Sequence, residues 1–299
     1  MNRRDLLQMS AALGAGISLS GCSPAAARTE GQPATAAPLP VPAVGLIPVA
    51  VLISNGAVII DFTGPWEVFQ SVQPNGRDNP FQLYTVAPTS APVVASGGMT
   101  IVPQYSVANA PTPKVVVIPA QSEPTAAVLA WVRSVAKTAD IVMSVCAGAF
   151  LLAQTGLLSG RAATTHHNAY TEFATSFPDI RLERGARFVD LGNLATAGGL
   201  SSGIDLALHV VERYFGRDVA TRTAWYLEYQ GQGWMDPNSN QAYAQAPRST
   251  DAHPLCPVCQ MDVDKATAPH STYQGKSYYF CTQAHKSLFD ASPERFLST

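Results

Sequence analysis

Apolar residues in this chain fall into short uninterrupted runs and into longer stretches where they recur every three or four positions. Short apolar runs are typical of strands buried in a parallel sheet, and the longer spacing is typical of helices that cover it. The pattern predicts helices over 63–69, 126–136, 169–177 and 201–215. It predicts strands over 46–54, 81–87, 115–119, 141–145, 162–166, 187–190 and 194–196, with a hairpin within 93–107. Alternating strands and helices indicate a doubly wound α/β sandwich over residues 46–230.

The segment 141–158 contains the most informative cysteine of the chain. A five-residue apolar strand runs directly into Cys146, and the small residues Ala147 and Gly148 precede an apolar helical segment. At the start of a helix, the helix dipole and unpaired backbone N–H groups favour a thiolate. We therefore predict a nucleophilic cysteine on a strand–turn–helix elbow. The alternative is a core cysteine, because free cysteine is among the most buried residue types.

Residues 1–22 are predicted to be an export signal. Arg3-Arg4 precedes a Gly/Ala-rich apolar stretch that ends in Leu19-Ser20-Gly21-Cys22, which resembles a twin-arginine signal followed by a lipoprotein processing site. An amphipathic helix is the alternative. Residues 23–45, rich in Ala, Pro, Thr and Ser, are predicted to be a disordered linker. We expect a periplasmic or membrane-anchored lipoprotein acylated at Cys22, with no other membrane attachment.

The last part of the chain carries a second set of cysteines. Residues 231–253, rich in Gln, Gly, Asn, Ser and Pro, are predicted to be a linker to a domain at 254–299. There a Cys256-Pro-Val-Cys259 pair is followed by Cys281 and His285, with an alternating strand over 273–280 between them. Three thiolates and an imidazole form a tetrahedral set suited to zinc or copper. A disulfide is the alternative reading of the same cysteines.

Charge gives little reason to expect a nucleic-acid partner. The chain has 46% hydrophobic and 13% charged residues and a formal net charge of −2. Such a surface has no electrostatic attraction for nucleic acid or for anionic lipid.

Four motifs in the larger domain carry a family resemblance. In order along the chain they are Asp61-Phe-Thr-Gly-Pro, Ser144-Val-Cys-Ala-Gly, Gly156–His166 and Gly198–Asp205. They resemble the ThiJ/PfpI superfamily, whose class I glutamine amidotransferase-like domain is a flavodoxin-like doubly wound sandwich. The most similar branch is that of the isocyanide hydratases and the sensor domains of AraC-type regulators. The resemblance implies a homodimer without a cofactor in this domain.

The resemblance also implies roles for site residues. Cys146 corresponds to the family nucleophile, and Asp61 corresponds to an acidic group beside the sulfur that donates a hydrogen bond or moves a proton. Capping the helix predicted from Thr63 is the alternative for Asp61. His166 is expected as an acid/base group, as a pocket wall or as a structural histidine.

Two departures from the family pattern concern the pocket. Ala147 stands where relatives carry His or Thr, which excludes an adjacent Cys–His dyad. Ala120-Gln121 stands where relatives commonly carry Gly-Gly, in a turn that supplies backbone N–H groups to an oxyanion site. We expect Gln121, Ala147 and Gly64 to line the pocket.

Residues 254–299 resemble a YHS domain. The resemblance rests on Cys-Pro-Val-Cys-x-Met, Ala-Pro-His-Ser, Gly-Lys-x-Tyr-Tyr-Phe-Cys and the late Phe-x-x-x-Pro-x-x-Phe pattern. It implies a small α+β domain that binds zinc or copper. Many such domains have Cys where this chain has His285. His270 and Met261 are further candidate ligands.

Two function classes follow from these features. The first is an exported, cysteine-dependent hydratase or hydrolase that acts on a small isocyanide-like or aldehyde-like electrophile and is coupled to a heavy-metal-binding tail. With an isocyanide substrate it would be a hydro-lyase of isocyanide-hydratase type. The alternative is a non-catalytic metal or thiol sensor of the cell envelope. A deglycase or chaperone-like role rests on the superfamily alone, and fold does not fix function.

Overall fold

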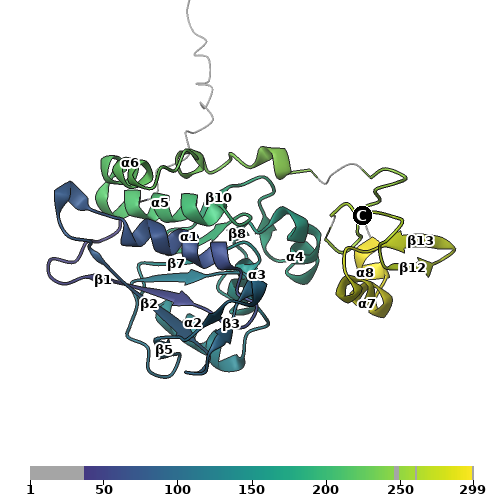
Figure 1. Cartoon of the computed structure of the whole chain (residues 1–299), viewed down its shortest axis with the longest axis horizontal. Coiled ribbons are helices and arrows are strands. Elements are labelled where there is room, and N and C mark those ends of the chain that lie inside the picture. The colour runs from purple at the N-terminus through teal and green to yellow at the C-terminus, as the bar shows by residue number, and fades with distance from the viewer. Residues whose placement is uncertain (1–36, 246–248, 260, 298–299) are drawn as a thin grey trace, which may run out of the picture. The chain divides into compact units, whose positions relative to one another are not determined.

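The computed structural model describes residues 37–245, 249–259 and 261–297. Its larger domain is built on a seven-stranded sheet in the order β10-β11-β7-β6-β1-β2-β5 (Figure 1). Neighbouring strands are parallel except for the β10–β11 pair. The strands are β1 Ile47–Leu52, β2 Phe81–Ala87, β5 Tyr105–Ser106, β6 Val115–Ile118, β7 Ile141–Val145, β10 Phe188–Asp190 and β11 Leu194–Ala197.

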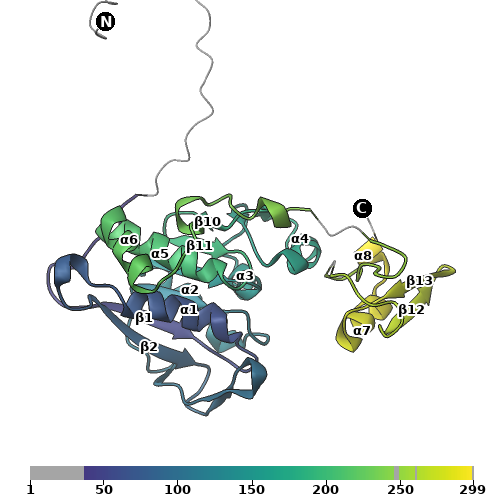
Figure 2. The ribbon, with the colours of Figure 1, turned by 45° about the horizontal axis from the view of Figure 1, so that its top comes forward.

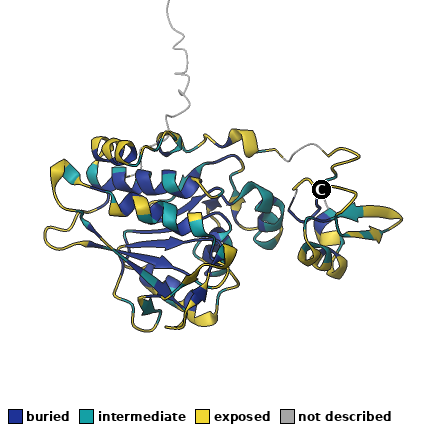
Figure 3. Cartoon of the chain, viewed as in Figure 1, coloured by how far each residue is buried: buried dark blue, intermediate teal, exposed yellow. Residues whose placement is uncertain are grey.

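Helices cover both faces of this sheet, and alternate strand residues pack against each layer. In β1, for example, Val49 and Val51 belong to one buried cluster, whereas Ala50 and Leu52 belong to the other. The first layer contains α1 Ile59–Gln70, α5 Ser202–Phe215 and α6 Arg217–Tyr226, and the second contains α2 Ala126–Val135, α3 Gly148–Gln154 and α4 Tyr170–Ser176. Figure 2 shows α1 and α5 lying along one side of the strands. Burial on both faces explains the uninterrupted apolar runs in the sequence (Figure 3). The predicted doubly wound sandwich is confirmed.

Several element boundaries differ from the sequence-based expectation. Helix α1 begins at Ile59, four residues before the expected start, and α6 was not predicted. The strand expected over 162–166 is only β8, Ala162–Ala163, which pairs with β9, Arg181–Leu182, outside the main sheet. The expected hairpin within 93–107 is present, as β3 Val93–Val94 paired with β4 Thr100–Ile101.

The first half of the segment expected to be a linker packs on the larger domain. Short 3-10 turns form over Gly233–Met235 and Gln241–Tyr243. The Trp234 side chain is only 4% exposed and belongs to the same buried cluster as α5. We call residues 231–245 the strap, because they contact Asp205 of α5 and Arg187, the residue just before β10.

The smaller domain has a hairpin and two helices around its own core. Strands β12 His270–Tyr273 and β13 Lys276–Tyr279 pair antiparallel around a Gln274-Gly275 turn. Helix α7 spans Gln283–Ala291 and α8 spans Glu294–Leu297. The buried side chains include those of Val258, Phe280, Phe289 and Phe296. This is the α+β domain expected from the sequence.

The predicted export signal lies outside the described residues, as do Cys22 and most of the linker expected over 23–45. Within the part of the chain that the structure describes, no helix is long and apolar enough to cross a membrane.

Candidate functional site

Cys146 occupies a strained backbone position at the carboxyl end of β7. Its φ is 59°, in the left-handed region that residues with a side chain rarely adopt, and α3 begins two residues later. The Cys146 N–H donates to the carbonyl oxygens of Gly198 at 2.9 Å and Ala197 at 3.2 Å. The predicted elbow is therefore present, and main-chain hydrogen bonds to the end of the adjacent strand β11 hold it.

Gly148 explains why small residues follow the cysteine. A Cβ added there would overlap the carbonyl oxygens of Ile118 and Pro119, at the end of β6. The glycine thus lets α3 start directly against the neighbouring strand. Because the carboxyl ends of parallel strands meet at one edge, the turn after β6 lies beside the elbow.

Asp61 lies in the first turn of α1 and has no solvent exposure. Its Oδ2 accepts a hydrogen bond from the Ala120 N–H at 3.1 Å. Its Oδ1 has no nitrogen or oxygen partner among the described residues. Val58 is the N-cap of α1 and makes no side-chain cap, so the alternative in which Asp61 caps this helix is wrong. The Ala120-Gln121 turn, which replaces the expected Gly-Gly, therefore donates one backbone hydrogen bond to Asp61.

Asp61 and Cys146 influence each other's protonation. Burial raises the pKa of Asp61 to about 7, although the Ala120 N–H and the Cys146 side chain act to lower it. Burial raises the pKa of the Cys146 thiol to about 12, and the nearby Asp61 charge adds to that effect. The backbone N–H groups of Leu200 and Ala147 lower it, but by less. Burial is the largest of these contributions, so it favours the thiol in the free protein, in contrast to the thiolate expected from the helix start.

His166 packs beside the elbow as a neutral ring. Its Nδ1 accepts a hydrogen bond from the Asn168 N–H at 3.2 Å, which places the ring proton on Nε2. It stacks on His167 at 4.4 Å between ring centroids, and burial lowers its pKa to about 4. A Cβ added at Gly199 would overlap the ring. These contacts fit a pocket wall or a structural histidine better than a proton donor near neutral pH.

Two of the three expected pocket residues meet in one hollow. Gln121 and Ala147 line a hollow of about 30 Å³ together with Gly148 and Phe150. The Gln121 Nε2 donates to the Leu52 carbonyl oxygen at 3.4 Å, and its buried Oε1 has no partner among the described residues.

Gly64, the third expected pocket residue, lies elsewhere. A Cβ there would approach the Ile204 side chain to 2.8 Å, at the contact between α1 and α5. The glycine is needed for close helix packing.

An ion pair that was not expected from the sequence lies close to the elbow. Arg187 contacts the fully buried Asp205 of α5, with Nε and Nη2 at 2.6 and 2.5 Å from Oδ2. Asp205 also accepts hydrogen bonds from the Tyr229 hydroxyl and the Trp234 N–H, both at 2.9 Å. An acidic residue on the apolar face of an amphipathic helix is a usable signal for such a pair, because a buried charge needs a partner.

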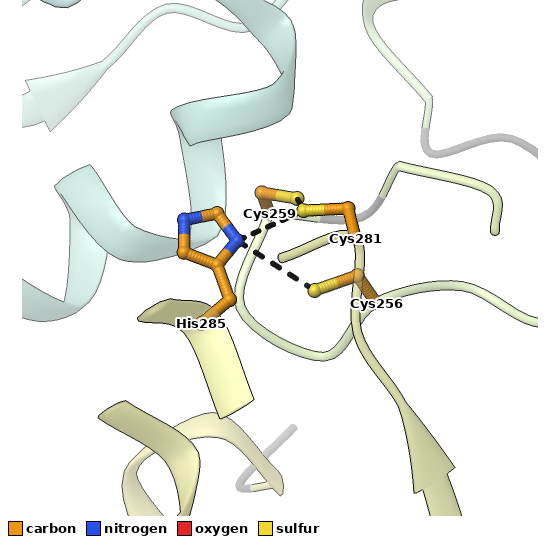
Figure 4. A group of neighbouring side chains, drawn as sticks. All are labelled: Cys256, Cys259, Cys281 and His285. Atoms are coloured by element: carbon orange, nitrogen blue, oxygen red, sulfur yellow. Dashed lines mark hydrogen bonds between the residues drawn. The ribbon is translucent and has the colours of Figure 1, made fainter. Parts of the chain in front are cut away.

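The candidate metal centre of the smaller domain brings all four predicted ligands together. The sulfur atoms of Cys256, Cys259 and Cys281 and a ring nitrogen of His285 lie within 4.8 Å of one another (Figure 4). The Sγ atoms of Cys259 and Cys281 are 3.5 Å apart, and the His285 Nδ1 lies 3.1 Å from the Cys281 Sγ and 3.8 Å from the Cys256 Sγ.

These distances fit a tetrahedral ion. Zinc–sulfur bonds of about 2.3 Å place two sulfurs of a tetrahedron about 3.8 Å apart. The three thiols are free, so the predicted alternative of a disulfide among them is not formed here. Hydrogen bonding from Cys259 and His285 lowers the pKa of Cys256 to about 3, and a thiolate is the form that binds a metal.

The two further candidate ligands lie apart from this set. His270 is exposed in β12, where its ring lies 5.9 Å from that of Tyr279. Met261 has a 40% exposed side chain, and its main-chain oxygen accepts the N–H of Cys256. The Cys3His set is therefore the donor set that the fold assembles.

Comparison with known proteins identifies both domains. Residues 48–213 match the DJ-1/PfpI family, and residues 256–299 match the YHS domain. The isonitrile hydratase of Pseudomonas putida is 33% identical over 178 residues, which cover 57% of this chain and 73% of the hydratase.

Transcriptional regulators are also similar to this chain. The HTH-type transcriptional regulator GlxA of Rhizobium meliloti is 28% identical over 58% of this chain and 54% of its own length. For the HTH-type transcriptional regulator CdhR of Pseudomonas aeruginosa the identity is 26%, over 48% of this chain and 44% of the regulator. The chain thus spans about half the length of these regulators.

Solved structures share the fold of the larger domain. A ThiJ/PfpI family protein from Pseudomonas syringae superposes with a TM-score of 0.56 and 28% identity, over 64% of this chain and 78% of that protein. Drosophila melanogaster DJ-1beta has a TM-score of 0.53 at 20% identity, over 62% of this chain and all of that protein, and shows the fold alone. The fold and family resemblances inferred from the motifs are confirmed.

Proposed function

The chain belongs to the DJ-1/PfpI family and ends in a YHS domain, and on this premise we propose that it is a cysteine-dependent hydratase of small isocyanide-like electrophiles. The observation that carries the proposal is the pairing of Cys146, on its strained elbow, with the buried carboxyl group of Asp61. The similarity to an isonitrile hydratase supports the choice of substrate class.

In the proposed reaction the Asp61 carboxylate takes the thiol proton as the Cys146 sulfur attacks the terminal carbon of the isocyanide. The carbon–sulfur bond forms, and Asp61 returns the proton to that carbon, which gives a thioimidate. Water then adds to the thioimidate carbon. Breaking the carbon–sulfur bond releases an N-substituted formamide and restores the thiol. One isocyanide and one water are consumed for each formamide.

The backbone around the sulfur supports this role. The N–H groups of Ala147 and Leu200 interact with the Cys146 side chain and stabilise negative charge on it. The Gln121 side chain supplies an unpartnered carbonyl oxygen in the adjacent hollow, which accepts a hydrogen bond from water or substrate. The proposed site thus combines the Cys146 nucleophile and the Asp61 proton carrier with a small hollow beside the elbow that Gln121 and Ala147 line.

The first prediction concerns the covalent intermediate. Rapid mixing with a small alkyl isocyanide is expected to add the mass of one isocyanide to the peptide that contains Cys146. Cys146→Ala removes the sulfur and is expected to lower turnover by at least ~10³-fold. Formamide production followed by chromatography, together with peptide mass spectrometry, measures both effects. Thr175→Ala, an exposed change on α4, serves as the matched control. Undiminished turnover in Cys146→Ala would refute the proposal.

A second candidate function is a cell-envelope metal or thiol sensor without turnover. The assembled Cys3His set favours it, as does the similarity of the larger domain to transcriptional regulators. The residues present fit zinc or copper(I), which when bound would be held by Cys256, Cys259, Cys281 and His285. Export and acylation at Cys22 belong to this proposal and to the first one alike.

The second prediction tests this metal site on the full chain. One zinc or copper(I) ion is expected per chain, and Cys259→Ser is expected to weaken binding by at least ~10-fold because a thiolate ligand is lost. Elemental analysis and the absorption spectrum with cobalt measure occupancy. His270→Asn, in the same domain but outside the ligand set, is the control and should retain the ion. Equal occupancy in Cys259→Ser and in the unchanged protein would argue against the site.

A further inference from the structure

The Gly198–Ser201 turn controls the surroundings of Cys146 from the side of β11. Its first carbonyl oxygen accepts the Cys146 N–H at 2.9 Å. Its third residue, Leu200, directs its own N–H at the cysteine side chain. Leu200 has a φ of 37°, and its side chain is 40% exposed. Packing therefore covers the Leu200 side chain only in part, and hydrogen bonds supply further restraint on this strained turn.

Arg187 forms hydrogen bonds with both ends of the turn. Its carbonyl oxygen accepts the Gly198 N–H at 2.9 Å, and its Nη2 donates to the Ser201 Oγ at 3.0 Å. The guanidinium group is itself fixed, because Nε and Nη2 contact Asp205 and Nη1 donates to the Asn240 Oδ1 at 3.1 Å. One side chain thus links the turn, α5 and the strap.

The strap completes this arrangement. The Trp234 N–H donates to the Asp205 Oδ1 at 2.9 Å. A Cβ at Gly233 would lie 2.8 Å from the Arg187 Nε and 2.9 Å from the Asp205 carboxyl group, so the strap backbone covers the ion pair closely. Covering a bidentate pair in this way keeps the guanidinium in one orientation.

We propose that Arg187 is a positioning residue for the chemistry of Cys146, because it holds the Gly198–Ser201 turn, whose first carbonyl oxygen accepts the Cys146 N–H and whose Leu200 N–H lies near the sulfur. The inference rests on the proposed role of Cys146 as a nucleophile. Arg187 does not touch the reacting atoms; it acts through the turn. Loss of its contact with Ser201 leaves the ion pair and the main-chain hydrogen bonds of Gly198 intact but loosens the far end of the turn, next to Leu200.

Ser201→Ala is the sharpest test, because Ser201 is exposed and the change removes only the contact between Arg187 and the turn. The third prediction is that iodoacetamide alkylates Cys146 about 3- to 10-fold more slowly in this variant at pH 8.5, because an N–H partner of the thiolate is lost part of the time. Greater access to the sulfur would change the rate in the opposite direction. Ser201→Thr, which keeps a hydroxyl group, is expected to restore the rate.

Alkylation is followed by peptide mass spectrometry on the full chain, with the thiols of the smaller domain as an internal reference. Arg187→Lys keeps the charge but cannot bridge Asp205, Asn240 and Ser201 at once, so a larger decrease is expected. Arg133→Lys, exposed on α2, is the control. Melting curves show whether each variant is folded.

The outcomes separate this inference from the proposed function. With an isocyanide substrate, Ser201→Ala is expected to lower kcat with little change in KM. A slower alkylation without any isocyanide turnover would retain the positioning role and reject the proposed reaction. Alkylation of folded Ser201→Ala at the unchanged rate would reject the positioning role, and Arg187 would then only stabilise the fold.

Discussion

Asp61 is a carboxyl group without solvent exposure, and a single backbone N–H replaces the water that would surround it in the unfolded chain. Removing a carboxylate from water favours the protonated form. The raised pKa of about 7 follows from this loss of hydration. Near neutral pH, Asp61 therefore exists in both forms, as a residue that accepts and returns a proton must.

The fourth prediction concerns this protonation. A carboxyl pKa raised from 3.8 to about 7 means that the folded state binds the proton more tightly than the unfolded state. This group therefore lowers the free energy of unfolding as the pH rises from about 4 through 7. Asp61→Asn removes the charge, so its stability relative to the unchanged protein should increase by roughly 4 kcal/mol between pH 4 and pH 8.

Urea unfolding at several pH values measures this difference. Turnover should increase through pH 7 in the unchanged protein, because the carboxylate accepts the thiol proton, and should be lost in Asp61→Asn. A stability difference that does not change with pH would contradict the assignment.

Cys146 shows what the sequence could predict at this scale. An apolar strand, a cysteine and small residues are local features, so they predicted the elbow and the residue on it. The protonation state depends on groups distant in sequence, because burial by the surrounding residues and then the Asp61 charge raise the thiol pKa. Local helix-start reasoning therefore predicted a thiolate, whereas burial raises the pKa of this sulfur and favours the thiol.

At the scale of elements, long and strongly patterned segments were predicted well. The apolar runs that became β1, β6 and β7 are buried on both faces, and the pattern of α5 matches its packing against the sheet. Helix α6 was missed because it follows α5 after Gly216 alone, whose φ of 85° both ends one helix and begins the next. Its polar sequence carries little periodic signal.

The start of α1 shows a second limit of the sequence. Thr63-Gly64-Pro65 suggested a helix start, since proline is favoured in the first turn. In the structure the Ile59 N–H donates to the Ser96 Oγ at 3.2 Å, and the Val58 N–H donates to the Ala120 carbonyl oxygen at 2.8 Å. These partners, supplied by distant segments, let the helix begin earlier. The earlier start puts Asp61 inside the first turn.

At the scale of the whole molecule, the strap extends the larger domain beyond the end that was expected from the sequence. Its polar composition is typical of a linker, yet Trp234 is buried and Asn240 is only 7% exposed. Both contact the Arg187–Asp205 pair. Composition could not indicate this packing, because the partner charges lie just before β10 and on α5. The domain boundary therefore depends on long-range contacts.

The fifth prediction tests the strap by truncation. A chain that ends at Gln230 loses the Trp234 side chain from the core and uncovers a buried ion pair. We expect it to be less stable than a chain that ends at Gln245 by about 3–5 kcal/mol. Thermal unfolding followed by circular dichroism measures the difference. Equal melting temperatures for the two chains would show that the strap does not stabilise the larger domain.

The 3.5 Å separation of the Cys259 and Cys281 sulfurs has a further consequence for the protein outside a reducing compartment. A disulfide bond is about 2.05 Å long, so these thiols need to move only about 1.5 Å to be oxidised together. Oxidation to a disulfide transfers two electrons from these sulfurs to the oxidant and leaves neither of them as the thiolate that binds a metal ion. Metal binding and oxidation therefore compete for the sulfur atoms of Cys259 and Cys281. We expect the domain to resist oxidants better with a metal ion bound than without one.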